Sequence, residues 1–537
     1  MYRGHQAPPS EDNPSRHISV FKEDLASNPG DFSPFRGQYC FGYLKAALPL
    51  GFRRYELPDG TTVAAHVDLP LFVKAEADAY LILIGLCFDH RNPQHGIAEI
   101  GEALFKAPSS DIVDHTHSLL GRWVAIKSDA EGKVAFSDAG GTLPLIHHFD
   151  GGTYVCAASS RLIATQRKHL APNPAITDEF RALQSTPGRH AGQSFPLRHT
   201  EYAGVQALLP NHYLDLQNGH AHRYYFGPAR FGTKSAKSLA PVIGDLVVAI
   251  VTAISARYPL AYAATGGFDS RLIAGGVSRV PGLAEKIDFF TFRYPDDAEG
   301  THDDVVLARK VAATIGGTHR VIDAQSDFPD PATSTICRRS EEFYATGFEG
   351  WVEKSRVEVD SDRVILMGWA SEIARCFFRW PGSHKVDAEQ VARCGGFGHI
   401  AAFRPEVASW LASAEQAHKL TGIPVLDLFY WENRVARWCS GGLNILNTGS
   451  HWMTIFSCRD LLDTMLSVRE ADRGGDHQTL YREIIKYLNP AISRIPINPV
   501  PLHKRLRKAA IYRIKSILLP VRDTIRHYTR PSPTAAG

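Results

Sequence analysis

The sequence contains no C-x-x-C pair and no apolar run long enough to cross a membrane. Its eight cysteines are widely scattered, which excludes a disulfide scaffold of the secreted type and favours the cytoplasm. The N-terminal stretch MYRGHQAPPSEDNPSRH lacks the apolar core of a signal peptide, so export is not expected. The longest apolar run, residues 81–87, is far shorter than the roughly 20 residues that span a bilayer and predicts a buried strand.

The sequence also lacks a large excess of charge of either sign. Lys and Arg total 59 against 56 for Asp and Glu, a formal net charge of +3, so we expect no nucleic-acid partner. No G-x-x-x-x-G-K-[ST] motif occurs, which leaves phosphoryl transfer of the P-loop type without support. With 44% hydrophobic and 21% charged residues, the 537-residue chain has an ordinary globular composition and length enough for several domains.

Patterning along the chain predicts an α/β protein with two main domains. Residues 1–36 are rich in Pro, Ser, Asp and Asn without a regular period, and we expect a flexible extension. Short β-type runs between Gly, Asp and Pro residues predict a β-rich domain over 37–226. Strands and helices then alternate, which predicts a parallel sheet covered by helices within 238–500. From about residue 341 the pattern is predominantly helical.

The segment AYAATGGFDSRLIAGG carries the strongest chemical signal. An apolar strand ends at Ala264 and a helix starts near Asp269. The turn between them consists of Thr265, Gly266 and Gly267. Paired glycines let the backbone approach a phosphate, and the helix start directs free N–H groups at it, with the Ser270 hydroxyl as a further donor. Asp269 would then hold Mg²⁺, or, in a plain strand-to-helix turn, it would only cap the helix.

TGGFDS resembles the S-G-G-x-D-S pyrophosphate loop of the ATP pyrophosphatases, in the form found in asparagine synthetase-like proteins. The downstream order is similar to theirs: a second strand at 289–294, an acid opening a helix at Asp304, and GGTH at 316–319. Farther on, VILMGWASEIARCFF resembles the family's turn G-[ED]-G-G-D-E, with Gly368 as its first glycine and Glu372 at the aspartate position.

This resemblance implies an ATP-dependent, AMP-forming ligase that uses ATP and Mg²⁺ to join a small-molecule or peptide carboxylate to an amine or ammonia. It implies a nucleotide site made of Ala264, Thr265, Gly266, Gly267, Ser270, Phe292 and Gly368. Asp269 and Glu372 would hold Mg²⁺, and together with Arg494 they would form the catalytic set. It also implies the adenine nucleotide α-hydrolase-like fold for the C-terminal domain.

Two departures from the family leave the chemistry open. Trp369 stands where asparagine synthetases have an acid and β-lactam synthetases a tyrosine. The family's late lysine is not evident, and Arg494 and Asn498 stand in that region instead. An intramolecular cyclase, similar to β-lactam synthetases or lasso-peptide cyclases, and a non-catalytic nucleotide-binding protein therefore remain as alternatives.

Residues 121–164 resemble the family's glutaminase domain, which implies an Ntn-hydrolase-like fold. A working glutaminase has an N-terminal cysteine whose own amine serves as the base. Here Met1 is followed by Tyr2, and the glutamine-binding N-G-E signature is replaced by GLCFDH near Gly85. Cys40 could become N-terminal only by extensive processing. We expect a degenerate domain without glutamine hydrolysis, so that the amine is free ammonia or a group of the substrate.

Two further features of the sequence are its histidine spacing and a basic segment near its end. His115, His117, His147 and His148 lack metal-ligand spacing, and no zinc is predicted. Within 501–537, a segment with nine Lys or Arg and one acid has apolar residues at helical spacing. It predicts a basic amphipathic helix that packs on the ligase domain or contacts an acidic partner or membrane surface.

Overall fold

The computed structural model describes residues 18–22, 33–184, 194–224, 231–293, 300–324, 330–340, 348–378, 386–398, 400–475 and 477–497. The chain divides into two compact units, Met1–Ile495 and Pro496–Gly537. All elements below belong to the first unit. The basic segment 501–537 lies outside the described residues.

Two antiparallel sheets form the N-terminal part of this unit. The first consists, in spatial order, of β1 (Ile18–Lys22), β5 (Leu71–Glu76), β6 (Ala79–Asp89), β7 (Leu119–Asp129), β8 (Gly132–Ser137), β12 (His212–Asp215) and β13 (Ala221–Arg223). The second consists of β11 (Val205–Ala207), β9 (Ile146–Asp150), β10 (Thr153–Ala157), β2 (Tyr39–Gly42), β4 (Thr62–His66) and β3 (Phe52–Glu56). Alternate residues of both sheets, such as Ile82 and Ile84 of β6 and Val63 of β4, fill the core between the sheets.

A helix covers the outer face of each sheet, which gives the order helix, sheet, sheet, helix. α1 (Ile97–Lys106) packs on the first sheet through Ile97, Ile100 and Leu104. α2 (Ser160–Gln166) packs on the second through Leu162 and Ile163. The other helices of this part are the 3₁₀ helix η1 (Ile112–Thr116) and α3 (Pro174–Gln184).

The C-terminal part contains one five-stranded parallel sheet. Its spatial order is β16 (His319–Asp323), β15 (Asp288–Arg293), β14 (Leu260–Ala263), β17 (Val364–Met367) and β18 (His451–Thr454). Chain order runs outward from β14 in one direction and then restarts at β17 in the other. The sheet therefore has a topological switch point between β14 and β17, where open α/β sheets bind their ligands.

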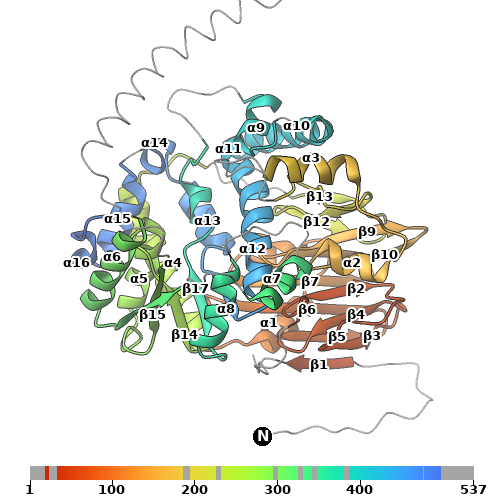
Figure 1. Ribbon diagram of the computed structural model, residues 1–537, viewed down its shortest axis with the longest axis horizontal. Helices are drawn as coiled ribbons and strands as arrows, with labels where there is room; N and C mark the ends of the chain where they lie inside the picture. The colour runs from red at the N-terminus through yellow and green to blue at the C-terminus, as the bar shows by residue number, and fades with distance from the viewer. Residues whose placement is uncertain are drawn as a thin grey trace, which may run out of the picture. The chain divides into compact units, whose positions relative to one another are not determined.

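Helices cover both faces of the parallel sheet (Figure 1). Near β14 and β15 lie α4 (Ala236–Ser255), α5 (Phe268–Ser278), α6 (Gly300–Thr314), α15 (Thr479–Leu488) and α16 (Pro490–Ser493). The face of β17 and β18 is covered by α7 (Pro331–Ser340), α8 (Glu349–Glu358) and α12 (Ser440–Leu446). The remaining elements are η2 (Ser371–Ala374), α9 (Ala388–Cys394), η3 (Ala401–Phe403), α10 (Arg404–Thr421), α11 (Val425–Phe429), the π-helix η4 (Tyr430–Cys439), α13 (Arg459–Leu466) and α14 (Glu470–Arg473).

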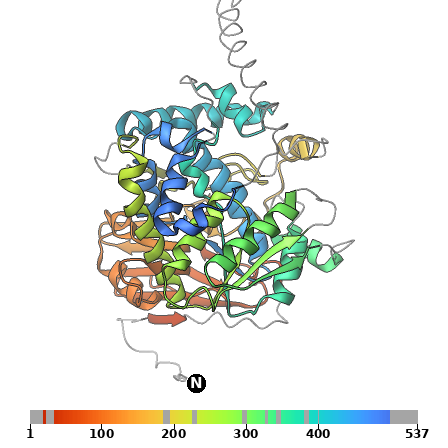
Figure 2. The same ribbon diagram turned by 90° about the vertical axis from the view of Figure 1, so that its left-hand side faces the viewer.

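Buried polar bonds join the two parts. Asn444 of α12 donates to the Ala158 carbonyl at 2.8 Å and accepts from the guanidinium of Arg122. The indole N–H of Trp431 donates to the Ala139 carbonyl at 2.7 Å. Figures 1 and 2 show the red and orange N-terminal strands gathered on one side of the unit, with the green and blue helices on the other. The expected boundary between 226 and 238 thus does not divide the chain into separate compact units.

α4 is the one described helix that is long and apolar enough to cross a membrane, with a mean hydropathy of 2.0. It packs against α5, α13 and α15. Gly244 allows close approach, since a Cβ there would lie 2.5 Å from the ring of Tyr487. Its contacts are those of a helix packed in the core.

The structure confirms a β-rich N-terminal part, a C-terminal parallel sheet and a predominantly helical remainder. The expectation of no regular structure before residue 36 is wrong for residues 18–22, which pair with β5 as an edge strand. Edge pairing of a short strand depends on the exposed backbone of its neighbour, which the polar composition of 1–36 does not reveal.

Candidate functional site

The candidate site lies at the carboxyl ends of β14 and β17, the two strands that flank the switch point. The segments that follow them meet there. A Cβ placed on Gly368, directly after β17, would lie 2.9 Å from the Cβ of Asp269 in the first turn of α5. Only a glycine permits this approach without displacing one of the two segments.

The loop after β14 is closed by its own hydroxyl groups. The Thr265 N–H donates to Ser270 Oγ at 3.0 Å, and the Thr265 hydroxyl lies 2.9 Å from the same oxygen. The Gly266 N–H donates to Asp304 Oδ1 of α6 at 2.7 Å. Gly267 caps α5 without a side-chain acceptor, which leaves the helix start able to receive an anion. Asp304, noted in the sequence for its place in a motif, thus holds the loop.

Asp269 and Glu372 are brought together, as the sequence predicts. Asp269 lies in the first turn of α5 and Glu372 in η2, directly after the Gly368 turn. Burial raises the pKa of both carboxyls; that of Glu372 reaches about 7, with the Asp269 charge adding to the rise. Two nearby carboxylates that are withdrawn from water repel each other and attract a cation.

Arg375 supplies a positive charge next to Asp269. Its Nη1 lies 3.1 Å from Asp269 Oδ2, and both side chains are largely buried, at 24% and 17% exposure. The charges of Asp269 and Glu372 also help to keep the pKa of Arg375 above its usual range. The ring of Tyr481 lies under the guanidinium, 5.5 Å from its carbon.

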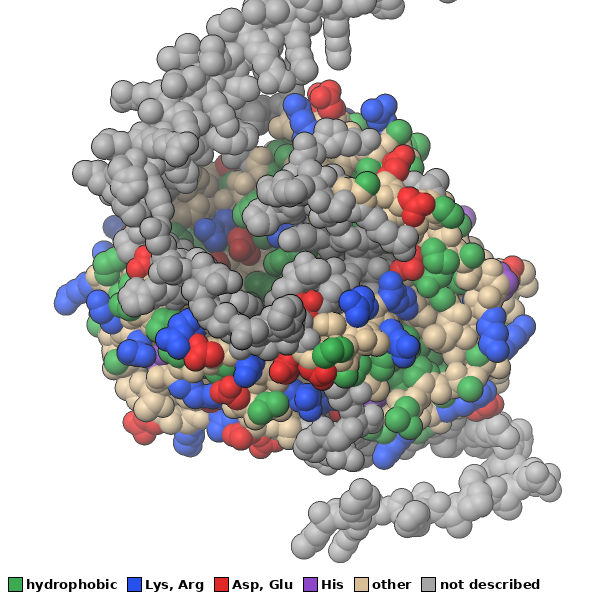
Figure 3. Space-filling view, viewed as in Figure 1, with side chains coloured by type: hydrophobic (Ala, Val, Ile, Leu, Met, Phe, Trp, Pro, Cys, Tyr) green, Lys and Arg blue, Asp and Glu red, His purple; other side chains and the backbone are tan. Residues whose placement is uncertain are grey.

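Hydroxyl groups complete this cluster. Ser371 donates to Asp269 Oδ1, and Tyr481 donates to the Ser371 carbonyl at 2.7 Å. A hydrogen bond from Tyr430 of the π-helix η4 lowers the pKa of Glu372, against the larger effect of burial. Four segments that are far apart in the sequence therefore contribute to one polar cluster. In the space-filling view, a hollow in this face of the unit contains both acidic and basic side chains (Figure 3).

The nucleotide residues expected on β14 and β15 are largely buried. Ala264 is 5% exposed, and its carbonyl accepts from the Thr291 hydroxyl at 2.7 Å. The same hydroxyl lies 2.8 Å from His319 Nε2, and burial lowers the pKa of that imidazole to about 4. Phe292 is 6% exposed and stacks on Trp351 at 5.0 Å, so its ring belongs to the core beneath the site.

Arg494 stands apart from the carboxylate cluster. It is exposed, directly after α16, and among the described residues no hydrogen bond or ion pair joins its side chain to Asp269 or Glu372. Its backbone is nevertheless held near α5, because Arg271 donates to the carbonyls of Ile492 and Ile495 on either side of it.

Trp369 forms an apolar wall beside the Gly368 turn. Its ring lies 5.0 Å from Trp438 and 5.5 Å from Phe348, and its carbonyl accepts from Thr454 at 2.5 Å. The guanidinium of Arg434 lies 3.8 Å from the centre of the Trp438 ring. The residue after Gly368 thus contributes aromatic surface to the site region rather than an acid.

Cys40 is not positioned as a nucleophile in the N-terminal part. It lies in the middle of β2, paired with both β4 and β10, and is 0% exposed. Burial raises its thiol pKa to about 12, so a thiolate is strongly disfavoured.

Sequence reasoning did not single out Arg375, Ser371, Tyr430 or Tyr481. Arg375 had a local signal, since it follows Glu372 by three residues in the segment that resembles the family turn. The two tyrosines come from η4 and α15 and had none. Neither a scan against family models nor a search of curated proteins finds a match to this chain.

Proposed function

We propose that this protein is an AMP-forming carbon–nitrogen ligase, similar to asparagine synthetase-like proteins. The observation that carries the proposal is the convergence of the Thr265–Gly267 loop, Asp269, Gly368 and Glu372 at the switch point of a parallel sheet. A carboxylate oxygen of the substrate attacks the α-phosphorus of ATP, and the bond to pyrophosphate breaks. An amine then attacks the acyl carbon, AMP leaves, and the nitrogen loses a proton to give the amide.

The loop after β14 holds the pyrophosphate. The hydroxyls of Thr265 and Ser270 lie 2.9 Å apart at the start of α5, where the first N–H groups of the helix are further donors. The Gly266 N–H becomes available when Asp304 releases it. Because no side chain near the site offers an accessible thiolate, we assign no covalent enzyme intermediate, and positioning with charge stabilisation accelerates the reaction.

Asp269 and Glu372 fit an Mg²⁺ that arrives with ATP. Both are carboxylates, the ligand type that Mg²⁺ prefers, and burial raises the pKa of both. When bound, the metal neutralises charge on the pyrophosphate. The ion pair with Arg375 and the hydrogen bond from Ser371 hold Asp269, and the hydrogen bond from Tyr430 holds Glu372.

The N-terminal part serves as a scaffold in this proposal. Its layer order of helix, sheet, sheet and helix fits the Ntn-hydrolase-like fold that the resemblance implies. Cys40 in the middle of a central strand supports the absence of glutamine hydrolysis. The nitrogen donor is then ammonia or an amine, and the aromatic wall at Trp369 favours an acid with an apolar group. We place this activity in the cytoplasm.

The deciding experiment is ATP–pyrophosphate exchange. The full chain is given ATP, Mg²⁺, labelled pyrophosphate and a panel of amino acids, peptides and sugar acids. A ligase returns label to ATP with its acid substrate and releases AMP. Asp269→Asn is expected to lose at least a hundredfold of this activity, whereas the exposed Asp362→Asn keeps it. Nucleotide binding with no exchange for any acid would favour a binding protein, and ADP as the product would refute the reaction type.

A further inference from the structure

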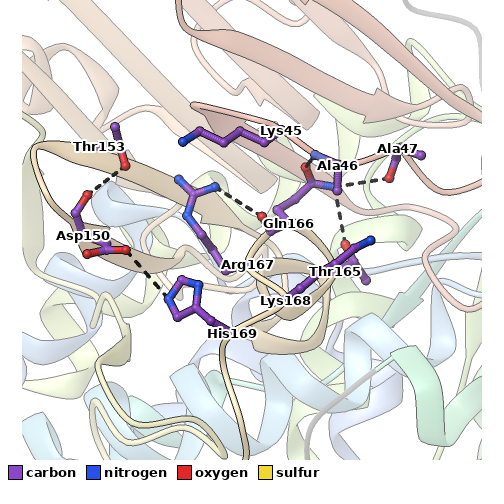
Figure 4. Close-up of a pocket in the computed structure, with 10 residues that line it drawn as sticks. All are labelled: Lys45, Ala46, Ala47, Asp150, Thr153, Thr165, Gln166, Arg167, Lys168 and His169. Carbon is purple, nitrogen blue, oxygen red and sulfur yellow. Dashed lines mark hydrogen bonds and ion pairs between the residues drawn. The ribbon is translucent and has the colours of Figure 1, made fainter.

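A second polar site lies in the N-terminal part, away from the nucleotide site. A pocket of about 680 Å³ opens between the β9–β10 hairpin and the segment after α2. Its lining is Lys45, Ala46, Ala47, Asp150, Thr153, Thr165, Gln166, Arg167, Lys168 and His169 (Figure 4). Asp150 and His169 face each other there, with His169 Nε2 3.8 Å from Asp150 Oδ2.

His148 completes a group of three possible ligands. It lies two residues before Asp150 on β9, so both side chains leave the strand on the same face. One ring nitrogen of His148, one of His169 and one carboxylate oxygen of Asp150 lie within 4.8 Å of one another. This spread is small enough for modest side-chain movement to bring all three atoms to a single ion.

The hydrogen bonding of His148 prepares it as a ligand. Its Nδ1 lies 3.1 Å from the Gly204 carbonyl oxygen. Because a carbonyl can only accept, Nδ1 carries the proton and Nε2 carries the lone pair. His148 is 7% exposed, and its Nε2 has no partner among the described residues. A carbonyl that fixes the tautomer through the other nitrogen is the usual outer partner of a metal-binding histidine.

We infer that His148, Asp150 and His169 form a binding site for a divalent transition metal ion, with Zn²⁺ as the best match to two imidazoles and one carboxylate. The ion accepts the lone pair of the buried His148 Nε2, and it also binds the exposed side chains of His169 and Asp150. Three protein ligands leave the fourth tetrahedral position open toward the pocket. The sequence prediction of no zinc is revised here, because strand pairing and the segment after α2 unite residues whose spacing gave no signal.

Cations around the pocket determine what takes the fourth position. Lys45, Arg167 and Lys168 line it, and the Arg167 Nη2 is buried without a partner among the described residues. These charges disfavour a bare metal ion with water and favour one that carries an anionic ligand. The site therefore holds Zn²⁺ together with a small anion or a carboxylate or phosphate group of a ligand.

Cobalt(II) titration of the untagged full chain, stripped of metal with EDTA, tests the site. We expect one Co²⁺ bound with the visible spectrum of a tetrahedral site, displaced by Zn²⁺ and altered by azide. His169→Ala and Asp150→Asn are expected to weaken binding at least about tenfold. Both replaced residues are exposed, at 58% and 57%, so these variants keep the fold.

His95→Ala is the matched control, since His95 is an exposed histidine outside the pocket. Its Co²⁺ affinity should equal that of the wild type. Equal affinity in His169→Ala and wild type, or an octahedral spectrum in the wild type, would overturn the site. No response to azide would overturn the anionic fourth ligand. Neither result depends on the ligase proposal.

Discussion

Arg375 Nη1 lies 3.1 Å from Asp269 Oδ2, at the point where the first turn of α5 meets the segment after β17. This ion pair neutralises one of two carboxylates that would otherwise face each other with little water. The other, Glu372, has a pKa of about 7, because burial withdraws it from water and the charge of Asp269 adds to the rise, against the smaller opposing effect of Arg375. The folded chain thus holds the cluster together, but Glu372 has no ion pair of its own among the described residues. The Mg²⁺ of a metal–nucleotide complex would supply positive charge at this carboxylate.

The contact at Gly368 gives the first prediction. Gly368→Ala places a Cβ 2.9 Å from the Cβ of Asp269, so either the turn or the start of α5 must shift. We expect at least a tenfold loss of pyrophosphate exchange, since misplaced catalytic groups lose rate steeply. Gly398→Ala is the control, because its Cβ would meet its nearest atom at 3.6 Å. Full activity in Gly368→Ala would show that this approach is unimportant.

Asp463 of α13 gives a pH prediction that is independent of function. Burial raises its pKa to about 7, and the charge of Asp460 adds to the rise. The charge of Arg459, whose guanidinium also donates to the Tyr224 hydroxyl, opposes it. The folded chain holds this proton more tightly than the unfolded chain does, so the free energy of unfolding should fall as pH rises from about 4 to 7. The loss is about 4 kcal/mol at most.

Asp463→Asn should remove this fall and raise the stability at pH 8. Urea unfolding at several pH values measures it, with the exposed Asp362→Asn as the control. A wild-type pH slope that persists unchanged in Asp463→Asn would assign the titration to another group.

Cys40 gives the third prediction. Because the thiol is fully buried and its pKa is raised to about 12, purified protein should release no glutamate from glutamine. Cys40→Ala should leave amide formation unchanged. Glutamate release that disappears in Cys40→Ala would reveal a processing event that frees this cysteine.

The elements around the nucleotide loop could be predicted because their signals are local. An apolar run, two glycines and a helical period placed β14 and the start of α5 to within a few residues. Motif order then paired Asp269 with Glu372. Tyr430 and Tyr481 could not be found this way, since each belongs to a helix whose own pattern only indicates burial.

The same limit applies to strands and ligands defined by pairing. β1 (ISVFK) is a single short run within a polar stretch, and its partner β5 lies about fifty residues farther along the chain. His148 and His169 are brought together by the packing of α2 on the second sheet, which no spacing rule encodes. Composition and hydrophobic periodicity predict helices and strands. Which distant residues contact each other can be read only from the assembled fold.

The last prediction uses Arg375 to test the proposed metal position. Arg375→Ala leaves Asp269 and Glu372 without their counterion, which should cost about 3–5 kcal/mol of stability. A divalent cation could supply the missing charge. We therefore expect Mg²⁺ to raise the melting temperature of Arg375→Ala by several degrees more than that of the wild type, because binding to the folded chain stabilises it.

Arg320→Ala is the matched control, since Arg320 also bridges two carboxylates, Asp288 and Glu358, but in a more exposed place. Its melting temperature should respond to Mg²⁺ as the wild type does. In Arg375→Ala combined with Asp269→Asn, the extra response should disappear because one carboxylate is gone. If Mg²⁺ shifts all four proteins equally, Asp269 and Glu372 do not form a cation site, and the metal in the proposed reaction must be held by the nucleotide alone.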